Sequence, residues 1–278
     1  MTSEVPRDPS AQECRPQFEV IPLRDIAEQV AEHLPPGSRV TVTASPAHGT
    51  AATISTALAL AERGFTAIPH LAARQIADVR ELRGILAELA SAGVHEVFVI
   101  AGDAPRPAGA FTGALDLVEV IDAERRGFTI GVGAHPEGHP FVGEQEALRL
   151  LKAKAEHASY LVTQMCFEAA PLLSWLQNIR DAGVTLPVRP GIAAPVGTAR
   201  LLRIGARIGV GRSLRLLTAP TSGVRRLVGP GSWRPDALLD ELAPAYRDPT
   251  SMLQGPHVYT FNDLAATGSW GIGSRVAE

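Results

Sequence analysis

The sequence is short of lysine and cysteine, with two of each among 278 residues. Cys14 lies in a polar N-terminal stretch and Cys166 follows an apolar segment, so we expect no disulfide framework. No run of 18 apolar residues is present, and residues 1–14 lack the pattern of a signal peptide. We therefore predict a cytoplasmic protein without a membrane partner. The net charge of −3 also argues against nucleic acid as the main partner.

Eight short segments rich in β-branched and apolar residues alternate with segments of helical periodicity. The clearest is residues 97–100, Val-Phe-Val-Ile, which predicts a strand buried on both faces. It ends at Ala101-Gly102-Asp103, and the prolines at 105 and 107 prevent its continuation. The eight predicted strands cover residues 18–21, 39–43, 66–69, 97–100, 129–132, 160–163, 186–189 and 258–261.

This alternation predicts a single-domain (β/α)8 TIM barrel, an α/β fold for which the chain has a typical length. We assign residues 17–278 to the barrel and residues 1–16 to a disordered N-terminal tail. A doubly wound open sheet is the alternative, but no Gly-x-Gly-x-x-Gly turn follows the first strand. Residues 201–256 have the least regular pattern, and we predict a helical stretch from about Thr198.

Several polar residues stand at or just past the ends of the predicted strands, which is where a TIM barrel carries its catalytic side chains. Glu19 lies inside the first strand, where an unpaired carboxylate is costly. It therefore either pairs with a barrel arginine or has a raised pKa, which suits a general acid. The polar residues expected on this face are Glu19, Thr43, His70, Asp103, His135, His139 and Gln164.

Each of the other polar residues has alternative interpretations. Asp103 either caps its own loop or accepts hydrogen bonds from a ligand's N–H groups. Gln164 carries an amide that needs several partners when buried, which favours a ligand contact. His135 and His139 have a spacing that suits metal ligands on a helix, but their Pro/Gly loop favours contact with a cofactor or substrate, or a structural role. Cys166 has no evident triad and is expected to be an inert buried thiol.

Seven short motifs in one order resemble the 5,10-methylenetetrahydrofolate reductase family over residues 18–200. That family has a (β/α)8 fold and reduces the methylene bridge of the folate to a methyl group, in one-carbon metabolism and methionine biosynthesis. Its electrons come from a nicotinamide, normally through bound FAD. The motifs are Phe18-Glu19, Val42-Thr43, Pro69-His70-Leu71, Gly102-Asp103-x-Pro105, Ala134-His135-Pro136-Glu137-Gly138-His139-Pro140, Thr163-Gln164-x-x-Phe167 and Pro190-Gly191-Ile192.

The resemblance implies a role for each matching residue. Glu19 matches the family's general acid, and Asp103 matches the aspartate that binds the pterin. Gln164 matches a glutamine that contacts folate and nicotinamide, and Phe167 is the aromatic end of the same motif. The implied cofactor-binding positions, around the flavin or nicotinamide, are Thr43, His70, His135, His139 and Lys154, and no metal is implied.

Departures from the family pattern fall mostly on the flavin side. The family usually has arginine where this chain has Ala101, and several polar positions have become apolar. We therefore hypothesise weak or no FAD binding, with hydride passing directly from NADH or NADPH to the folate. The departing positions are Ala101, Ala44-Ser45-Pro46, His135, Ala147, Leu150, Ala153 and Asn262-Asp263.

Three other functions fit parts of the pattern. The first is a conventional FAD-dependent member of the family, and the second is a folate-binding protein without turnover, which would not need Glu19. The third is a metal-dependent hydrolase using His70, Asp103, His135 and His139, although no His-x-His lies on the first strand. The sequence carries no indication of the oligomeric state or of a choice between NADH and NADPH.

Overall fold

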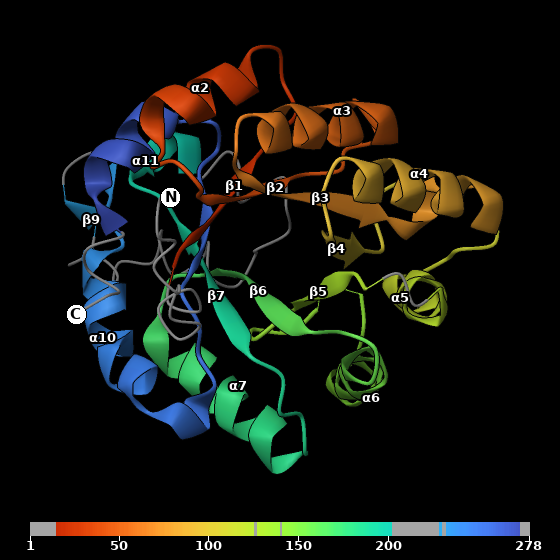
Figure 1. Ribbon diagram of the computed structural model, residues 1–278. Helices are drawn as coiled ribbons and strands as arrows, with labels where there is room; N and C mark the ends of the chain where they lie inside the picture. The colour runs from red at the N-terminus through yellow and green to blue at the C-terminus, as the bar shows by residue number, and fades with distance from the viewer. Residues whose placement is uncertain (1–14, 125–126, 140, 202–227, 230–231, 273–278) are drawn as a thin grey trace, which may run out of the picture.

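The computed structural model describes residues 15–124, 127–139, 141–201, 228–229 and 232–272. Eight parallel strands close into a barrel in the order β1-β11-β7-β6-β5-β4-β3-β2 (Figure 1). The predicted single-domain (β/α)8 fold is thereby confirmed. The barrel strands are β1 (Gln17–Val20), β2 (Arg39–Val42), β3 (Thr66–Ala72), β4 (Glu96–Ile100), β5 (Thr129–Ala134), β6 (Tyr160–Cys166), β7 (Val188–Ala193) and β11 (His257–Tyr259).

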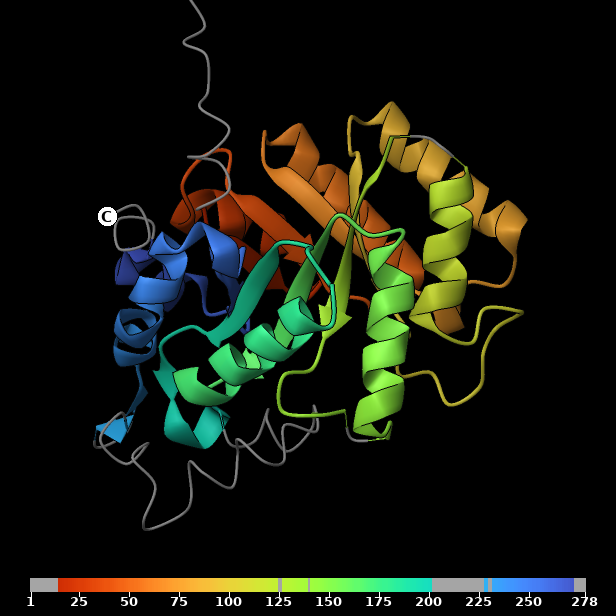
Figure 2. The ribbon, with the colours of Figure 1, turned by 90° about the horizontal axis from the view of Figure 1, so that it is seen from below.

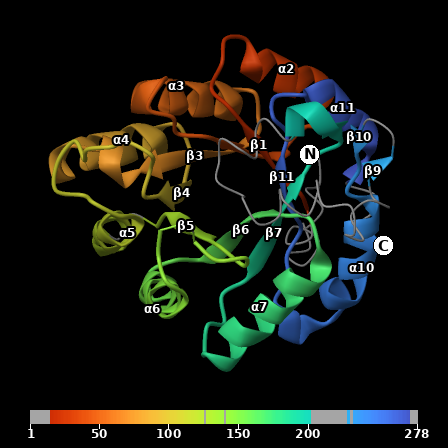
Figure 3. The ribbon, with the colours of Figure 1, turned by 180° about the vertical axis from the view of Figure 1, so that it is seen from behind.

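Helices surround the barrel, as Figures 1 and 3 show from opposite sides and Figure 2 from below. Each helix covers the strands with an apolar stripe. In α4, for example, Leu82, Leu86 and Leu89 are buried, and the Asp78 carboxylate caps the first turn. The helices are α2 (Ile26–His33), α3 (Gly49–Glu62), α4 (Val79–Ser91), α5 (Ala114–Ala123), α6 (Glu144–Ala155), α7 (Ala169–Asp181), α10 (Asp236–Arg247) and α11 (Leu264–Trp270), with short 3₁₀ turns η1 (Ala73–Gln75) and η3 (Pro249–Ser251).

Strand β3 is longer than predicted, and its extension places a site residue inside the barrel. The prediction ended it at Pro69, but the strand continues to Ala72. Its first four residues pair with β2, and the pairing with β4 begins only at His70, opposite Phe98. Such stagger is inherent in a closed barrel. His70 therefore stands within a strand, not in a loop.

Strand β6 is also longer than predicted and is irregular where it reaches the site. Its pairing with β7 shifts between Val162 and Met165. This irregularity brings the Thr163 carbonyl against β7, where a Cβ on Gly191 would lie 2.3 Å from that oxygen. Glycine at position 191 thus permits the close approach of the two strands that displaces Gln164 from regular pairing.

The segment after β7 differs from the prediction. A helix begins at Thr198 as expected, but the structure adds three short antiparallel strands, β8 (Val196–Gly197), β9 (Val228–Gly229) and β10 (Ser232–Trp233). They were missed because two-residue strands carry no periodicity. Residues 202–227 and most of the predicted tail, residues 1–14, lie outside the described part of the chain. The proposed domain boundaries at residues 16 and 17 therefore stay a prediction.

Candidate functional site

Glu19 lies near the carboxyl end of β1 and is the centre of a buried cluster with two histidines. Its Oε2 is 3.1 Å from Nε2 of His257 on β11 and 3.7 Å from Nε2 of His70 on β3. The side chains of His257 and His70 are 1% and 5% exposed, whereas that of Glu19 is 18% exposed. The carboxyl group is therefore the member of the cluster that a ligand can reach.

The cluster changes the pKa values of its members. Burial raises the pKa of Glu19, but the hydrogen bond and positive charge of His257, with the charge of His70, lower it below its ordinary value. Burial lowers the pKa of His70 to about 4 despite the nearby Glu19. The expectation of a raised pKa for Glu19 is therefore wrong for this cluster, and its partners are histidines, not the barrel arginine considered as the alternative.

A second polar layer lies beneath this cluster, toward the amino ends of the strands. Gln17 Nε2 is 3.1 Å from Nδ1 of His257, and Gln17 Oε1 accepts a hydrogen bond from Arg39 at 3.2 Å. Arg39 forms an ion pair with Glu96. A continuous chain of polar contacts thus runs from Glu96 on β4 to Glu19 on β1, and it fixes the orientation of the His257 ring.

Asp103 is exposed in the loop that follows β4. Gly102 precedes it with φ +86°, where a Cβ would lie 2.8 Å from Cβ of Ala72, so glycine is needed for this turn. No described residue donates a hydrogen bond to the Asp103 carboxylate. The interpretation as a loop cap is therefore not supported, and the carboxylate is available to accept hydrogen bonds from a ligand.

Arg74, in η1, holds the loop that carries Asp103. Its guanidinium donates hydrogen bonds to three carbonyl oxygens, those of Ala104 at 2.7 Å, Pro105 at 2.9 Å and Thr112 at 3.3 Å. Its backbone also pairs with Ala101 and Ala108. The hydrogen bonds of Arg74 to the loop backbone thus fix the position of Asp103, which is consistent with a preorganised binding residue.

Gln164 is half-buried at the irregular end of β6. Its Oε1 accepts a hydrogen bond from its neighbour's backbone, Met165 N, at 2.8 Å, and this orients the amide. Tyr259 of β11 approaches the same place, since its hydroxyl donates to the Thr163 carbonyl at 3.1 Å. The amide NH₂ of Gln164 makes no hydrogen bond with another described residue, so it is free to donate to a ligand.

His135, His139 and Lys154 form a separate group beyond the end of β5. The two imidazole rings meet edge to face with centroids 4.6 Å apart, and the Lys154 ammonium donates to the Gly133 carbonyl at 2.8 Å. Burial lowers the pKa of Lys154 to about 8, and burial, followed by the charges of His139 and Lys154, lowers that of His135 to about 4. These three predicted cofactor residues lie together, whereas His70 belongs to the Glu19 cluster.

Phe167 and Thr43 were predicted to contact the substrate and the cofactor, but they do not belong to either group of side chains described above. Phe167 is 1% exposed and packs edge to face against Trp233 with ring centroids 4.9 Å apart. It is a core residue here, and the structure does not bring it to the ligand-accessible face. Thr43 is half-buried at the end of β2, where its carbonyl accepts a hydrogen bond from Thr53 at 2.9 Å. Burial raises the pKa of Cys166 to about 12, in keeping with an inert thiol.

One position that the resemblance places beside the flavin carries no cation in this chain. Ala101 is exposed at the end of β4 and offers no donor to a diphosphate. The nearby Arg74 already donates to three loop carbonyls, and Lys154 donates to Gly133. A guanidinium has five N–H donors and an ammonium has three, so each cation keeps donors beyond these hydrogen bonds. Ala101 is therefore the described position beside them that lacks a charge-assisted contact for a diphosphate.

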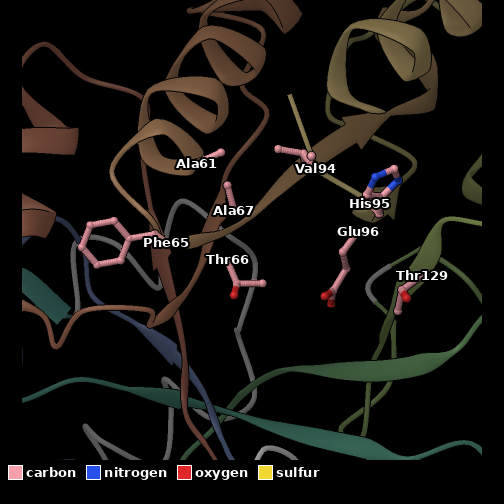
Figure 4. A pocket seen from close by; sticks show the side chains of 9 residues that line it. Ala61, Phe65, Thr66, Ala67, Val94, His95, Glu96 and Thr129 are labelled. Carbon is pink, nitrogen blue, oxygen red and sulfur yellow. The ribbon is translucent and has the colours of Figure 1, made fainter. Parts of the chain in front are cut away.

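A cavity of about 310 Å³ lies at the opposite end of the barrel (Figure 4). Thr66, Glu96 and Thr129 line it at the amino ends of β3, β4 and β5, so it is separate from Glu19.

Within the described ranges, no three His, Cys, Asp or Glu side chains are placed to hold a metal ion. No helix of the described chain is long and apolar enough to cross a membrane.

Sequence reasoning missed Gln17 and His257. The first strand was predicted to begin at Phe18, although the alternation along a strand places Gln17 on the same face as Glu19. His257 precedes the predicted start of the last strand at Val258, which is three residues long in the structure. For Gln17 the available signal was its position two residues before Glu19, which places both side chains on one face of the strand.

Comparisons with known proteins agree with the motif order. Residues 18–210 match the family model described as methylenetetrahydrofolate reductase. Methylenetetrahydrofolate reductase 2 of Saccharomyces cerevisiae is 31% identical over 123 residues, 40% of this chain and 20% of that protein. The 5,10-methylenetetrahydrofolate reductase of Escherichia coli is 33% identical over 132 residues, 46% and 44% of the two chains. Methylenetetrahydrofolate reductase (NADH) 1 of Zea mays is 30% identical over 133 residues, 41% and 22%. The chain therefore matches less than half the length of these relatives.

Proposed function

This chain belongs to the methylenetetrahydrofolate reductase family, and we propose that it reduces 5,10-methylenetetrahydrofolate to 5-methyltetrahydrofolate with NADH or NADPH. The observation that carries the proposal is the carboxyl group of Glu19, which a ligand can reach and which accepts a hydrogen bond from His257. Glu19 lies near the end of β1, within the residues that match the family model. The proposal includes a cytoplasmic location and a place in methionine biosynthesis. Relatives named for NADH and for NADPH both occur, so the reductant is proposed only as a nicotinamide.

The reaction needs one proton and one hydride. Glu19, as the acid, would protonate the folate nitrogen that leaves the methylene carbon, so that the five-membered ring opens to an iminium. The nicotinamide would then transfer hydride to that carbon and leave as NAD(P)⁺. General acid catalysis of this kind contributes about 10²–10⁴-fold to a rate. The chain itself would supply the proton and position the two reactants within about 3–3.5 Å of each other.

The folate would be held on the same face by Asp103 and Gln164. The exposed Asp103 carboxylate would accept hydrogen bonds from the amino and ring N–H groups of the pterin. Its loop is already ordered by Arg74, so little entropy is lost on binding. The Gln164 NH₂ would contact the folate and nicotinamide. His135, His139, Thr43 and Lys154 would line the nicotinamide side.

We propose weak or no FAD binding, with direct transfer of hydride from the nicotinamide. Support comes from Ala101, which stands where the family usually has arginine, and from Ala147, Leu150 and Ala153, which are apolar where the resemblance implies polar contacts with the flavin. Direct transfer is chemically sufficient because the iminium carbon accepts hydride without an intermediate carrier. The hypothesis distinguishes this chain from a conventional FAD-dependent member of the family.

The visible absorption spectrum of the purified chain, followed by NADH and NADPH oxidation with methylenetetrahydrofolate, tests the proposal. We expect a colourless protein whose activity needs the folate and does not rise on addition of FAD. Flavin absorption, or activity that depends on FAD, would show a conventional flavoenzyme instead. A colourless protein that binds folate without turnover would show the non-catalytic alternative.

Replacement Glu19→Gln tests the acid. We expect a loss of about 10²–10⁴-fold in kcat, because the amide cannot release a proton, while folate affinity is kept. Steady-state kinetics and equilibrium binding of the folate measure the two quantities. The matched control is Glu28→Gln on the exposed face of α2, where Glu28 forms a surface ion pair with Arg63. Full activity of the Glu19→Gln protein would refute the proposed role.

A further inference from the structure

We propose that Gln17 holds His257 as the neutral tautomer protonated at Nε2, and that the acid proton of Glu19 is thereby confined to its Oε1. Gln17 is a positioning residue in this proposal, since it acts on Glu19 through His257. The tautomer is a property of the folded chain by itself. Only the consequence for proton transfer rests on the function proposed above.

The orientation of the Gln17 amide follows from its contact with Arg39. A guanidinium has only N–H donors, so the Gln17 atom that receives the Arg39 hydrogen bond at 3.2 Å must be the carbonyl oxygen. Arg39 is itself held by its ion pair with Glu96, and their side chains are 13% and 12% exposed. The Gln17 NH₂ group is therefore the atom group directed at His257, 3.1 Å from Nδ1.

The tautomer of His257 follows from the Gln17 orientation. An NH₂ group donates, so Nδ1 of His257 must accept and cannot carry a proton. The single ring proton then lies on Nε2, which donates to Glu19 Oε2 at 3.1 Å. If His257 were an imidazolium, its Nδ1–H would face the Gln17 NH₂ group, so that two hydrogen-bond donors would meet without an acceptor. Since His257 is 1% exposed, water cannot relieve that conflict.

Among the described residues that face the cluster, no other group supplies a compensating charge. His70 lies 3.7 Å from Oε2, and its Nε2 is buried with no hydrogen-bond partner among the described residues. Burial keeps it neutral by lowering its pKa to about 4. Tyr259 packs against the His257 ring, and burial raises its pKa well above 10. Arg39 and Glu96 neutralise each other.

The consequence is an asymmetric carboxyl group. Oε2 of Glu19 accepts the hydrogen bond from Nε2–H of His257, and a proton on Oε2 could not be shared with His257, because Nε2 has no free lone pair in this tautomer. Oε1 is the carboxyl oxygen that His257 leaves unoccupied. The proton of the acid form therefore resides on Oε1. In the reaction, the Oε1–H bond breaks, its proton passes to the leaving folate nitrogen, and the electron pair remains on the carboxylate, which His257 Nε2–H stabilises.

The same tautomer bears on how Glu19 could serve as an acid although it lies beside His257 and His70. The charges of His257 and His70 lower the pKa of Glu19, against the opposing effect of burial. A neutral His257 removes one of these charges and leaves its hydrogen bond, which lowers the pKa of Glu19 more than either charge, in place. Burial of Glu19 acts against that hydrogen bond.

Nitrogen-15 NMR of the histidine-labelled full chain at neutral pH tests the tautomer directly. The His257 signals are assigned through the contact with the Tyr259 ring, 4.8 Å between centroids. We expect a protonated Nε2 and an unprotonated Nδ1. A doubly protonated ring, or a proton on Nδ1, would overturn the proposal. This measurement needs no variant and no turnover, so its outcome is independent of whether the chain is a reductase.

Replacement Gln17→Glu sharpens the test. The carboxylate keeps an acceptor for Arg39 and presents a second acceptor to Nδ1, so His257 should become doubly protonated. The added charge on His257 should lower the pKa of Glu19. In an active enzyme, kcat should therefore begin to fall at a pH about one unit lower, which is a tenfold loss at a fixed pH above this point. Gln29→Glu, the same change on the exposed face of α2, should leave both readouts unchanged. An unaltered His257 signal in folded Gln17→Glu protein would contradict the proposal, whereas the expected NMR result without wild-type reductase activity would refute only the proposed function.

Discussion

The two ends of the barrel treat polar groups in opposite ways. At the amino end, Arg39 pairs with Glu96, and Arg189 donates to the carbonyls of Arg15 and Gly255 at 3.0 and 2.9 Å. At the carboxyl end, by contrast, the exposed Asp103 carboxylate receives no hydrogen bond from a described residue, and the Gln164 NH₂ group donates none to another described residue. The two arginines of the first end are held by bonds within the chain, although the Nε atom of each is buried without a hydrogen-bond partner among the described residues. The second end leaves accessible donors and acceptors for a ligand.

The difference shows how one barrel divides its polar residues between stability and function. Buried charges need an ion-pair or hydrogen-bond partner to be tolerated. At the amino end Arg39 has Glu96, and Arg189 has two backbone carbonyls. Unpaired polar groups at the carboxyl end cost folding energy and are retained where a ligand can complete them. Substitutions at the two ends should therefore affect different measurable quantities.

The largest effect on stability is expected at the amino end. Glu96→Gln leaves the Arg39 guanidinium buried without its ion pair, which should lower the free energy of unfolding by about 3–5 kcal/mol. Denaturant unfolding measures the change. Glu28→Gln removes the carboxylate of a surface ion pair with Arg63 and should leave the midpoint nearly unchanged. Equal unfolding midpoints for the two variants would contradict the expected difference between a buried and a surface ion pair.

An intermediate effect is expected for His70, and it depends on pH. Burial lowers the pKa of His70 in the folded chain from 6.5 to about 4. Between these values an unfolded chain binds the proton and the folded chain does not, so stability falls as the pH drops, by up to about 3 kcal/mol. His70→Gln should make the free energy of unfolding less steep over this pH range.

Unfolding curves at several pH values measure this slope. The matched control is His48→Gln, at an exposed position before α3, which should keep the wild-type slope. If the slope survives in His70→Gln, the proton uptake on acid unfolding arises at another residue, and the buried neutral state of His70 would be refuted.

The smallest effect is expected for Asp103, and it should appear in binding alone. Asp103→Ala removes a carboxylate acceptor, and hydrogen bonds to charged groups contribute about 1.5–3 kcal/mol, so KM for the folate should rise by roughly 10–100-fold. The unfolding midpoint should not change, since no described residue bonds to this carboxylate. Asp78→Ala should do the reverse, losing about 1 kcal/mol of stability with its helix cap and no folate affinity. Any pattern in which Asp103→Ala destabilises the fold and spares KM would contradict the assignment of the two ends.

Much of the fold could be predicted because its strands are apolar and buried on both faces. Six of the eight predicted strands lie mostly within the observed ones, whereas the strands predicted at residues 186–189 and 258–261 share only two residues each with β7 and β11. The predicted ends of β3 and β6 were wrong because neighbouring strands in a barrel are staggered, and pairing with β4 or β7 extends a strand beyond its apolar run. Strands β8 and β10 were missed, since two residues are too few for any pattern.

The candidate site was predictable only as a set of residue types at strand ends. Placement at the ends of β1 and β3 indicated that Glu19 and His70 share a face, and the structure brings them within 3.7 Å. The same reasoning could not show that Phe167 turns into the core against Trp233, because the tryptophan is 66 positions away in the chain. It also could not find His257, whose strand is bounded by irregular sequence.

The sequence by itself determined the barrel, the family and the residues able to donate or accept protons, since these depend on local patterns of apolarity and on side-chain chemistry. Only the tertiary structure decided the charge and hydrogen-bonding state of those residues. Glu19, Gln17 and His257 are joined by contacts between β1 and β11, the two ends of the chain that close the barrel. The direction of a pKa shift and the choice of a tautomer arise from such contacts in a buried environment, and no pattern along one strand contains them.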